Sequence, residues 1–238
     1  MIKKKAPTKF LIFPLLAILI ASCTTISYVP KVSLDLSPKT INKTVQIDRF
    51  KDASPAEHKI TPFMGLSVTN RESLANELDL EVTNAVVSDF SENRLFKEVG
   101  RKIENPDFVI KGEIKEFYGK SQLNAFAKIS IITAIVGPMA AIFAKELWIL
   151  YLSYAPIFSW YFGAPVSKNT SEIVIEMSLY DNNNDKLINT YTGKGTVLNS
   201  SSMYDNKVFA IPTMTNKAFS RAIMQIRDQI LADMDKLE

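Results

Sequence analysis

The stretch Glu172–Tyr180, which reads EIVIEMSLY, decides the fold that we expect for this chain. Apolar side chains alternate with polar ones along it, and this two-residue period is typical of a strand with one buried face. The polar run Asp181–Lys186 (DNNNDK) predicts a turn, after which Leu187–Leu198 returns as a partner strand. The sequence therefore predicts an antiparallel hairpin, followed by a polar loop at Asn199–Asn206.

Further strands and helices are expected on both sides of this hairpin. Thr44–Phe50 and Phe108–Tyr118 show the same alternation and predict two more strands. Arg71–Asn93, with Asn70 as its N-cap, and Thr213–Leu237 carry apolar residues at three- and four-residue steps, which predicts two amphipathic helices. The expected fold class is α+β, with both helices packed on a small mixed, mostly antiparallel sheet.

A segment of different composition interrupts this pattern. Leu123–Ser167 contains three charged residues, Lys128, Lys145 and Glu146, and both tryptophans of the chain. We expect an inserted apolar helical segment that contacts a membrane or a partner, because apolar surface of this extent is rarely left in water. Its candidate contact residues are aromatic: Phe143, Trp148, Tyr151, Tyr154, Phe158, Trp160, Tyr161 and Phe162.

Three arrangements are open for this segment. It could cross a membrane as a hairpin with Lys145–Glu146 at its tip, lie in the membrane interface, or be buried by the domain or a partner chain. The interfacial arrangement is favoured over the hairpin, because Pro138 and Pro156 would kink both halves and because Trp and Tyr prefer the headgroup region.

The N-terminus resembles the export signal of bacterial lipoproteins. Four lysines precede Phe10–Ile20, an uncharged run of 11 residues that is too short to span a bilayer. Ile20-Ala21-Ser22-Cys23 resembles a lipobox. The resemblance implies cleavage between Ser22 and Cys23, with diacylglycerol on the Cys23 sulfur and acyl chains such as palmitate holding the protein to a bilayer.

This resemblance also implies an address and a domain organisation. In such lipoproteins an Asp after the cysteine commonly retains the protein at the inner membrane, and Thr24 stands there instead. The expected location is therefore the outer membrane, facing the periplasm, although the apolar segment leaves the inner membrane open. The expected parts are a signal peptide (1–22), a lipidated tether (23–43), the first part of the α+β domain (44–122), the apolar segment (123–167) and the second part of the domain (168–238).

Charge and cysteine content exclude several classes of protein. The chain has 238 residues and a net charge of +3, from 28 Lys+Arg against 25 Asp+Glu. Removing the four lysines of the signal leaves 24 basic and 25 acidic residues, interspersed and without a basic stripe, so we expect no nucleic-acid partner. A single cysteine excludes a disulfide framework within one chain.

Positive signs of catalysis or cofactor binding are lacking in the sequence. His58 is the only histidine, no G-x-S-x-G nucleophile motif accompanies it, and we expect it at the surface. The run from Asp181 starts like a calcium loop, but Lys186 and Thr192 replace the Gly and Glu that such a loop needs. Gly193-Lys194-Gly195 is too short to cradle a phosphate. We expect neither enzymatic activity nor a metal or cofactor.

A looser resemblance concerns Leu95–Val99 (LFKEV) and Asp107–Ile114 (DFVIKGEI). These motifs resemble envelope lipoproteins whose domain is like the N-terminal domain of TolB, the periplasmic domain of CsgG, or small YajG-like lipoproteins. The similarity covers residues 44–122 and 172–238 and implies helices on one side of a mixed sheet, in a binding or assembly module. The apolar segment does not resemble the amphipathic strands of a curli-type pore.

The function expected from the sequence is that of a lipid-anchored cell-envelope protein, acting as a non-enzymatic binding or assembly module. Its expected partners are the bilayer, through Cys23, and an unidentified envelope protein or a second copy of the chain. One alternative is an auxiliary lipoprotein of an envelope transport or secretion complex. Another is a hydrolase acting on envelope lipid, with the apolar segment as its lid.

Overall fold

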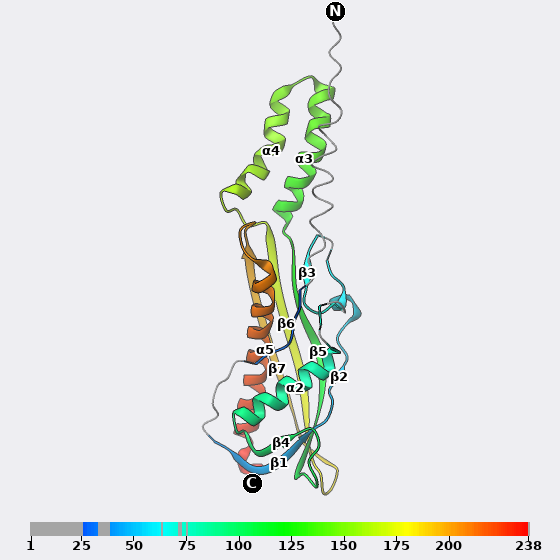
Figure 1. The fold of residues 1–238 in the computed structure, drawn as a ribbon, viewed down its shortest axis with the longest axis vertical. Helices are drawn as coiled ribbons and strands as arrows, with labels where there is room; N and C mark the ends of the chain where they lie inside the picture. The colour runs from blue at the N-terminus through cyan, green and yellow to red at the C-terminus, as the bar shows by residue number, and fades with distance from the viewer. Residues whose placement is uncertain (1–25, 33–38, 63, 71–72, 75, 238) are drawn as a thin grey trace, which may run out of the picture.

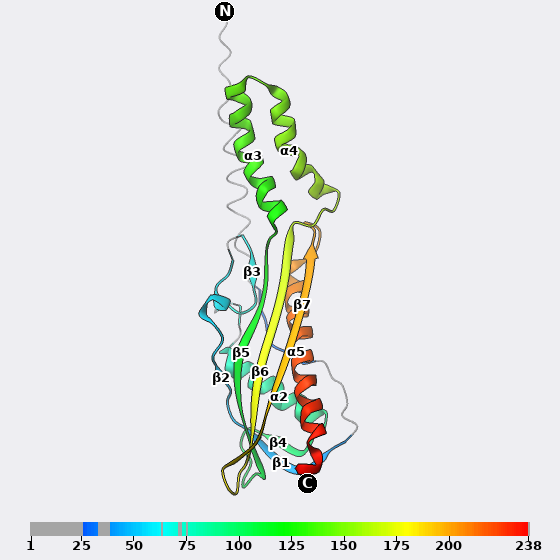
Figure 2. The ribbon, with the colours of Figure 1, turned by 180° about the vertical axis from the view of Figure 1, so that it is seen from behind.

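The computed structural model shows a long twisted sheet, with helices on one face and a helical hairpin projecting from one end (Figures 1 and 2). It describes residues 26–32, 39–62, 64–70, 73–74 and 76–237. The predicted signal peptide, the cleavage site and Cys23 therefore lie outside the described residues.

The sheet is mixed. Its main strands are β1 (Ile41–Ile47), β4 (Phe96–Gly100), β5 (Phe108–Leu123), β6 (Ser167–Asp181) and β7 (Lys186–Ser201), in the order β4-β1-β5-β6-β7. Strand β1 runs parallel to β4 and β5, whereas β5, β6 and β7 are antiparallel. Two short strands, β2 (Lys51–Asp52) and β3 (Leu66–Ser67), also pair with β5. The predicted α+β fold class is confirmed.

The predicted central hairpin is confirmed as β6 and β7, and it is longer than expected. Pairing continues from Asp181 opposite Lys186 to Ser167 opposite Ser201. The apolar residues that alternate along β6 are fully buried. Strand β6 begins five residues before Glu172 and β7 ends three residues after Leu198. Polar side chains at this end of the hairpin, such as Ser167 and Ser171, are themselves buried.

Helices α2 (Leu78–Glu92) and α5 (Lys207–Ala232) lie on the same face of the sheet (Figures 1 and 2). Their apolar stripes meet the buried residues of β5 and β6 in one core, where the rings of Phe117 and Phe219 pack edge to face 5.6 Å apart. Arg227 of α5 and Asp89 of α2, both buried, pair at 3.7 Å between Nε and Oδ2. Short 3-10 turns, η2 (Ala56–Lys59) and η3 (Met234–Lys236), complete the described elements.

Helix α5 also covers the outer edge of β7. Gln229 accepts a hydrogen bond from the Thr192 N–H (3.3 Å) and donates one to the Thr192 carbonyl (2.8 Å). Gln225 accepts from the Lys194 N–H (2.9 Å), and Arg221 donates to the Thr196 carbonyl (2.8 Å). Backbone groups that an edge strand normally leaves unpaired are thus bonded by helix side chains.

Several boundaries differ from the predictions, and one strand was not predicted. Strand β1 is Ile41–Ile47 where Thr44–Phe50 was expected, and β5 continues beyond Tyr118 to Leu123. Asn70 is not a helix N-cap, because its side chain accepts from the Ser73 N–H (2.8 Å) in a turn and α2 begins eight residues later. Helix α5 begins six residues before Thr213 and runs through Pro212, where burial of Ile211 outweighs one lost backbone bond. Strand β4 was not predicted, since five edge residues carry too little alternation.

Part of the segment expected to be a tether packs on the domain. Ile26 and Tyr28 belong to the core, and the Tyr28 hydroxyl donates to Asn216 Oδ1 at 3.0 Å. Tyr28 also forms a parallel bridge with Leu74, which holds the chain before α2 in an extended conformation. This contact explains why the helical period near Leu74 does not produce a helix.

Candidate functional site

The predicted apolar segment forms two helices, α3 (Ala125–Ala144) and α4 (Leu147–Tyr161), joined in a hairpin (Figure 1). The hairpin connects β5 and β6, whose pairing extends to Leu123 opposite Ser167. Asn124 secures its base: its N–H donates to the Val166 carbonyl (3.1 Å), and its side chain caps α3 by accepting from the Ala127 N–H (2.8 Å). The hairpin is therefore attached to the rigid end of the sheet.

The two helices contact each other through small residues. Gly137, Pro138 and Ala141 are buried on α3, and Ser153 is the buried residue of α4. A Cβ atom at Gly137 would lie 1.6 Å from Ser153 Oγ, so glycine is needed for this approach. The Ser153 hydroxyl donates within its own helix to the Ile149 carbonyl (2.6 Å). Close packing through small residues is typical of helix pairs in membranes.

The outer surface of the hairpin is exposed and apolar. Apart from Lys128, the exposed residues of α3 and α4 are apolar or aromatic. The large ones on the two helices are Phe126, Ile129, Ile132, Ile135, Val136, Met139, Ile142, Phe143, Leu147, Trp148, Tyr151, Leu152, Tyr154, Phe158 and Tyr161. The expected alternative in which the domain itself buries this segment is therefore not what the structure shows.

The eight predicted contact aromatics lie at several levels of the hairpin. Seven are exposed, with Phe143 and Phe162 the most so at 81% and 89%. Trp160 is half-buried, and its ring N–H has no partner among the described residues. Trp148 lies near the tip and Tyr161 near the base, about 20 Å apart along a helix of 1.5 Å rise. Trp and Tyr are the aromatic residues that favour the interface between lipid and water.

Charge is confined to the ends of the hairpin. Lys145 and Glu146 form its tip, with Lys145 in a left-handed conformation that ends α3, and Lys128 lies in the first turn of α3. Among the described residues, α3 is the helix long and apolar enough to cross a membrane, with a mean hydropathy of 1.9 and 28% of that window buried. Twenty residues of α helix span about 30 Å, the thickness of the hydrocarbon core.

The turn between β7 and α5, together with the first turn of α5, adds exposed apolar side chains, and Met203 and Tyr204 lie within the predicted polar loop Asn199–Asn206. Tyr204 and Phe209 are exposed, and the Tyr204 hydroxyl donates to the Tyr161 carbonyl at the hairpin base (3.0 Å). The pair Met203-Tyr204 within a polar run was the signal that could have indicated this surface.

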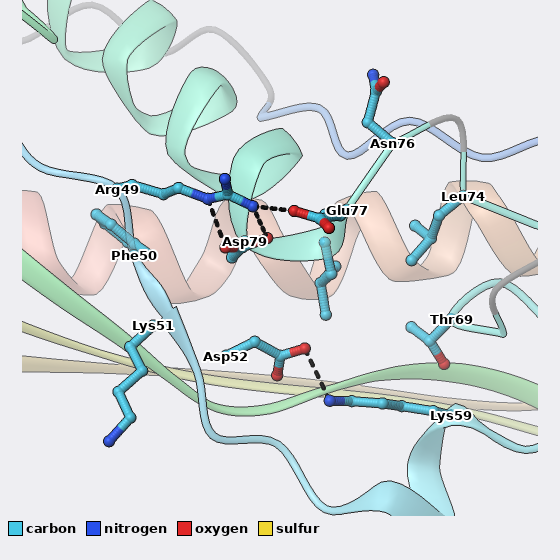
Figure 3. Close-up of a pocket in the computed structure, with 11 residues that line it drawn as sticks. Arg49, Phe50, Lys51, Asp52, Lys59, Thr69, Leu74, Asn76, Glu77 and Asp79 are labelled. Carbon is cyan, nitrogen blue, oxygen red and sulfur yellow. Dashed lines mark hydrogen bonds and ion pairs between the residues drawn. The ribbon is translucent and has the colours of Figure 1, made fainter.

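An open pocket of about 1000 Å³ lies between the β1–β2 segment and the start of α2 (Figure 3). Five of its six charged side chains pair within the pocket: Arg49 bonds Asp79 at 2.6 Å and also Glu77, and Lys59 bonds Asp52 at 2.8 Å, whereas Lys51 points away from them (Figure 3). The Arg49 hydrogen bond holds the pKa of Asp79 below its usual value. Because these charges are paired with one another, the pocket has little net charge to attract a charged ligand.

His58 is less exposed than predicted. Its side chain is 16% exposed, and it lies on the sheet face opposite the helices, with Nδ1 2.6 Å from Glu116 Oε2 and its ring 4.3 Å from that of Tyr118. The Tyr118 hydroxyl donates to Glu172 (2.9 Å), and burial above all raises the pKa of Tyr118 to about 12. Its surroundings are carboxylates and a phenol, which attach the η2 loop to the sheet.

Comparisons with known proteins are limited to structure. No family model matches the chain, and no curated protein matches it. Among the described residues, no group of three or more His, Cys, Asp and Glu side chains could hold a metal ion.

Several solved structures are similar to this chain at low identity. A DUF330 protein from Xanthomonas campestris is 11% identical with a TM-score of 0.46, covering 87% of this chain and 98% of that one. A candidate neuraminyllactose-binding hemagglutinin homologue from Helicobacter pylori is 10% identical with a TM-score of 0.42, covering 86% and 98%. A candidate lipoprotein from Caulobacter crescentus is 10% identical with a TM-score of 0.32, covering 68% and 84%. At these values, no function transfers to this chain.

Proposed function

We propose that this chain is a lipid-anchored cell-envelope protein, a non-enzymatic binding or assembly module whose α3–α4 hairpin inserts into a lipid bilayer. The observation that supports it is the hairpin surface, which is apolar around its whole exposed circumference. By the lipobox resemblance and Thr24, the bilayer is the outer membrane and the domain faces the periplasm.

The energetic argument is that this surface requires a cover. Burying one large apolar side chain is worth about 1.5–3 kcal/mol, whereas a whole domain is stable by only about 5–15 kcal/mol. Fifteen such side chains on the two helices are exposed, to between 36% and 81%. Their transfer into hydrocarbon is therefore worth at least as much as the stability of a whole domain.

The geometry favours insertion over lying flat in the interface. An interfacial helix has a polar face for the headgroups, whereas the outward residues of α3 and α4 are apolar apart from Lys128. The charged tip, Lys145–Glu146, would reach the far headgroups because α3 matches the hydrocarbon thickness at about 30 Å. Lys128, near the base, can extend its amine to the near headgroups.

Chain reach supports a shared membrane for the lipid and the hairpin. The ring of Tyr28 lies 6.4 Å from that of Phe117, and Phe117 is six residues before Leu123 at the hairpin base. Six strand residues span about 20 Å. The five residues from Cys23 to Tyr28 extend up to about 17 Å. The reach falls about 3 Å short of the hairpin base, which is less than the depth of one headgroup layer, so a lipid on Cys23 and the hairpin can share one membrane.

The test uses the mature protein in vesicles whose lipids carry bromine on their acyl chains, a contact quencher of tryptophan. Trp160→Phe leaves Trp148 as reporter, and Trp148→Phe leaves Trp160. We expect blue-shifted emission and bromine quenching at both positions. Emission at the wavelength of tryptophan in water would overturn the proposal, and a blue shift without quenching would do so as well, because it indicates burial by protein.

A further inference from the structure

The end of the domain from which the hairpin emerges has its own exposed apolar side chains. Met203, Tyr204 and Phe209, in and just after the β7–α5 turn, are exposed at 42%, 63% and 72%. They continue the hairpin surface, because the Tyr204 hydroxyl bonds the Tyr161 carbonyl at 3.0 Å. An inserted hairpin would therefore bring this turn to the membrane surface.

Charge is distributed unevenly between the two ends of the molecule. At the hairpin end, residues 119–128, 162–170 and 198–208 contain four lysines and one aspartate. At the opposite end, residues 100–107, 181–186 and 233–237 contain four basic and six acidic residues. Lys128 and Lys168 are exposed at the hairpin end. A cationic end is attracted to a membrane with anionic headgroups, and the acidic end is repelled.

We infer that Met203, Tyr204, Phe209, Lys128 and Lys168 form a basal collar that binds the anionic headgroup layer on the near side of the bilayer. This inference rests on the proposed insertion of the hairpin and adds a second contact to it. The aromatic residues of the collar reach the interface, where Tyr and other amphipathic rings are favoured, and the two lysines meet phosphate. The collar thereby sets the depth of the hairpin and holds the long axis of the domain away from the membrane plane.

The first test measures the depth of the collar in the full mature protein. With Trp148→Phe and Trp160→Phe removing the native reporters, Phe209→Trp and Tyr204→Trp each introduce one at the collar, and Leu187→Trp introduces a matched one at the opposite end, where Leu187 is also exposed. Phe209→Trp keeps the Tyr204 hydrogen bond. The vesicles contain lipids brominated either close to the headgroup or deep in the chain.

We expect quenching of both collar reporters by the shallow bromines more than by the deep ones, and no quenching of the Leu187→Trp reporter. If Trp148 in the Trp160→Phe variant is quenched while neither collar reporter is, the collar inference is overturned and hairpin insertion stands. If Trp148 is also unquenched, both fail.

The second test measures the role of charge. Adding phosphatidylglycerol to phosphatidylcholine vesicles should increase shallow quenching of the Phe209→Trp reporter. Lys128→Gln with Lys168→Gln should abolish this increase, whereas Lys97→Gln with Lys186→Gln, the same charge change at exposed sites away from the hairpin end, should preserve it. Equal behaviour of the two pairs would overturn the electrostatic part of the inference.

Discussion

Gly193 and Gly195 allow helix α5 to lie directly against strand β7. A Cβ atom at Gly195 would lie 1.8 Å from the Ala218 carbonyl oxygen, and one at Gly193 would lie 2.0 Å from that of Ala222. The two contacts repeat at the same distance along both elements. Ala218 and Ala222 are separated by a helix rise of about 6 Å, and the two glycines by a strand rise of about 6.6 Å. The motif that is too short to bind phosphate is therefore a packing motif.

Gly195→Ala should destabilise the domain by about 2–3 kcal/mol, because the backbone of α5 must move away from β7. Gly163→Ala is the matched control: Gly163 has a positive φ of 84° and open space around its Cβ position, so only backbone strain opposes it. That strain costs about 1 kcal/mol. Urea unfolding in detergent, followed by circular dichroism, measures both. Equal losses would show that the close approach contributes nothing.

At the scale of elements, the sequence predicted those that bury one face over a long stretch. Strands β5, β6 and β7 and helix α5 were recognised because their apolar residues keep a constant period over many residues. Strand β4 and the start of α2 were not, because they are decided by distant partners: β1 beside β4, and Tyr28 beside Leu74. Local period carries no information about such partners.

The candidate site was predictable in part. Composition identified the apolar segment and its aromatic residues, because three charges in 45 residues is exceptional for a soluble surface. Composition did not show that the helices project from the sheet, since a buried helix pair has the same sequence character. The basal collar was missed because it joins residues from three separate segments, which only the fold brings to one end.

Replacing Ala125–Pro165 with Asn-Gly should leave the domain folded. Asn124 and Val166 already bond across the β5–β6 ladder, so a two-residue turn can join them. The core lies between the sheet and helices α2 and α5 and contains no residue of the hairpin. In a chain that also lacks residues 1–23, we expect solubility without detergent and an unfolding midpoint like that of the full chain. Loss of the cooperative melt in circular dichroism would show that the hairpin belongs to the core.

At the scale of the whole molecule, the two membrane contacts should be independent. Two acyl chains on one residue hold a protein stably, and so does an inserted helical hairpin. Cys23→Ala should abolish labelling by acyl lipid and leave unprocessed precursor. The chain should remain with the membranes after an alkaline carbonate wash when either anchor alone is removed.

Three forms of the chain measure this independence. The first exchanges residues 1–23 for a leader that is cleaved without acylation, the second carries the Asn-Gly replacement of the hairpin, and the third combines both. We expect only the third in the supernatant after the carbonate wash. Release of the first form would mean that the hairpin does not anchor the chain, and the proposed insertion would then be wrong.

The side chains of α5 that bond the outer edge of β7 have a consequence for crowding. A membrane anchor confines chains to a plane and aligns their long axes, so neighbouring sheets would meet edge to edge at high local concentration. An edge strand of this length with unpaired backbone groups would then hydrogen-bond to the edge of the next molecule, and the molecules would polymerise. Because Gln225, Gln229 and Arg221 already bond the edge from Thr192 to Thr196, this stretch of β7 would not pair with the next molecule in an array formed by the proposed anchor.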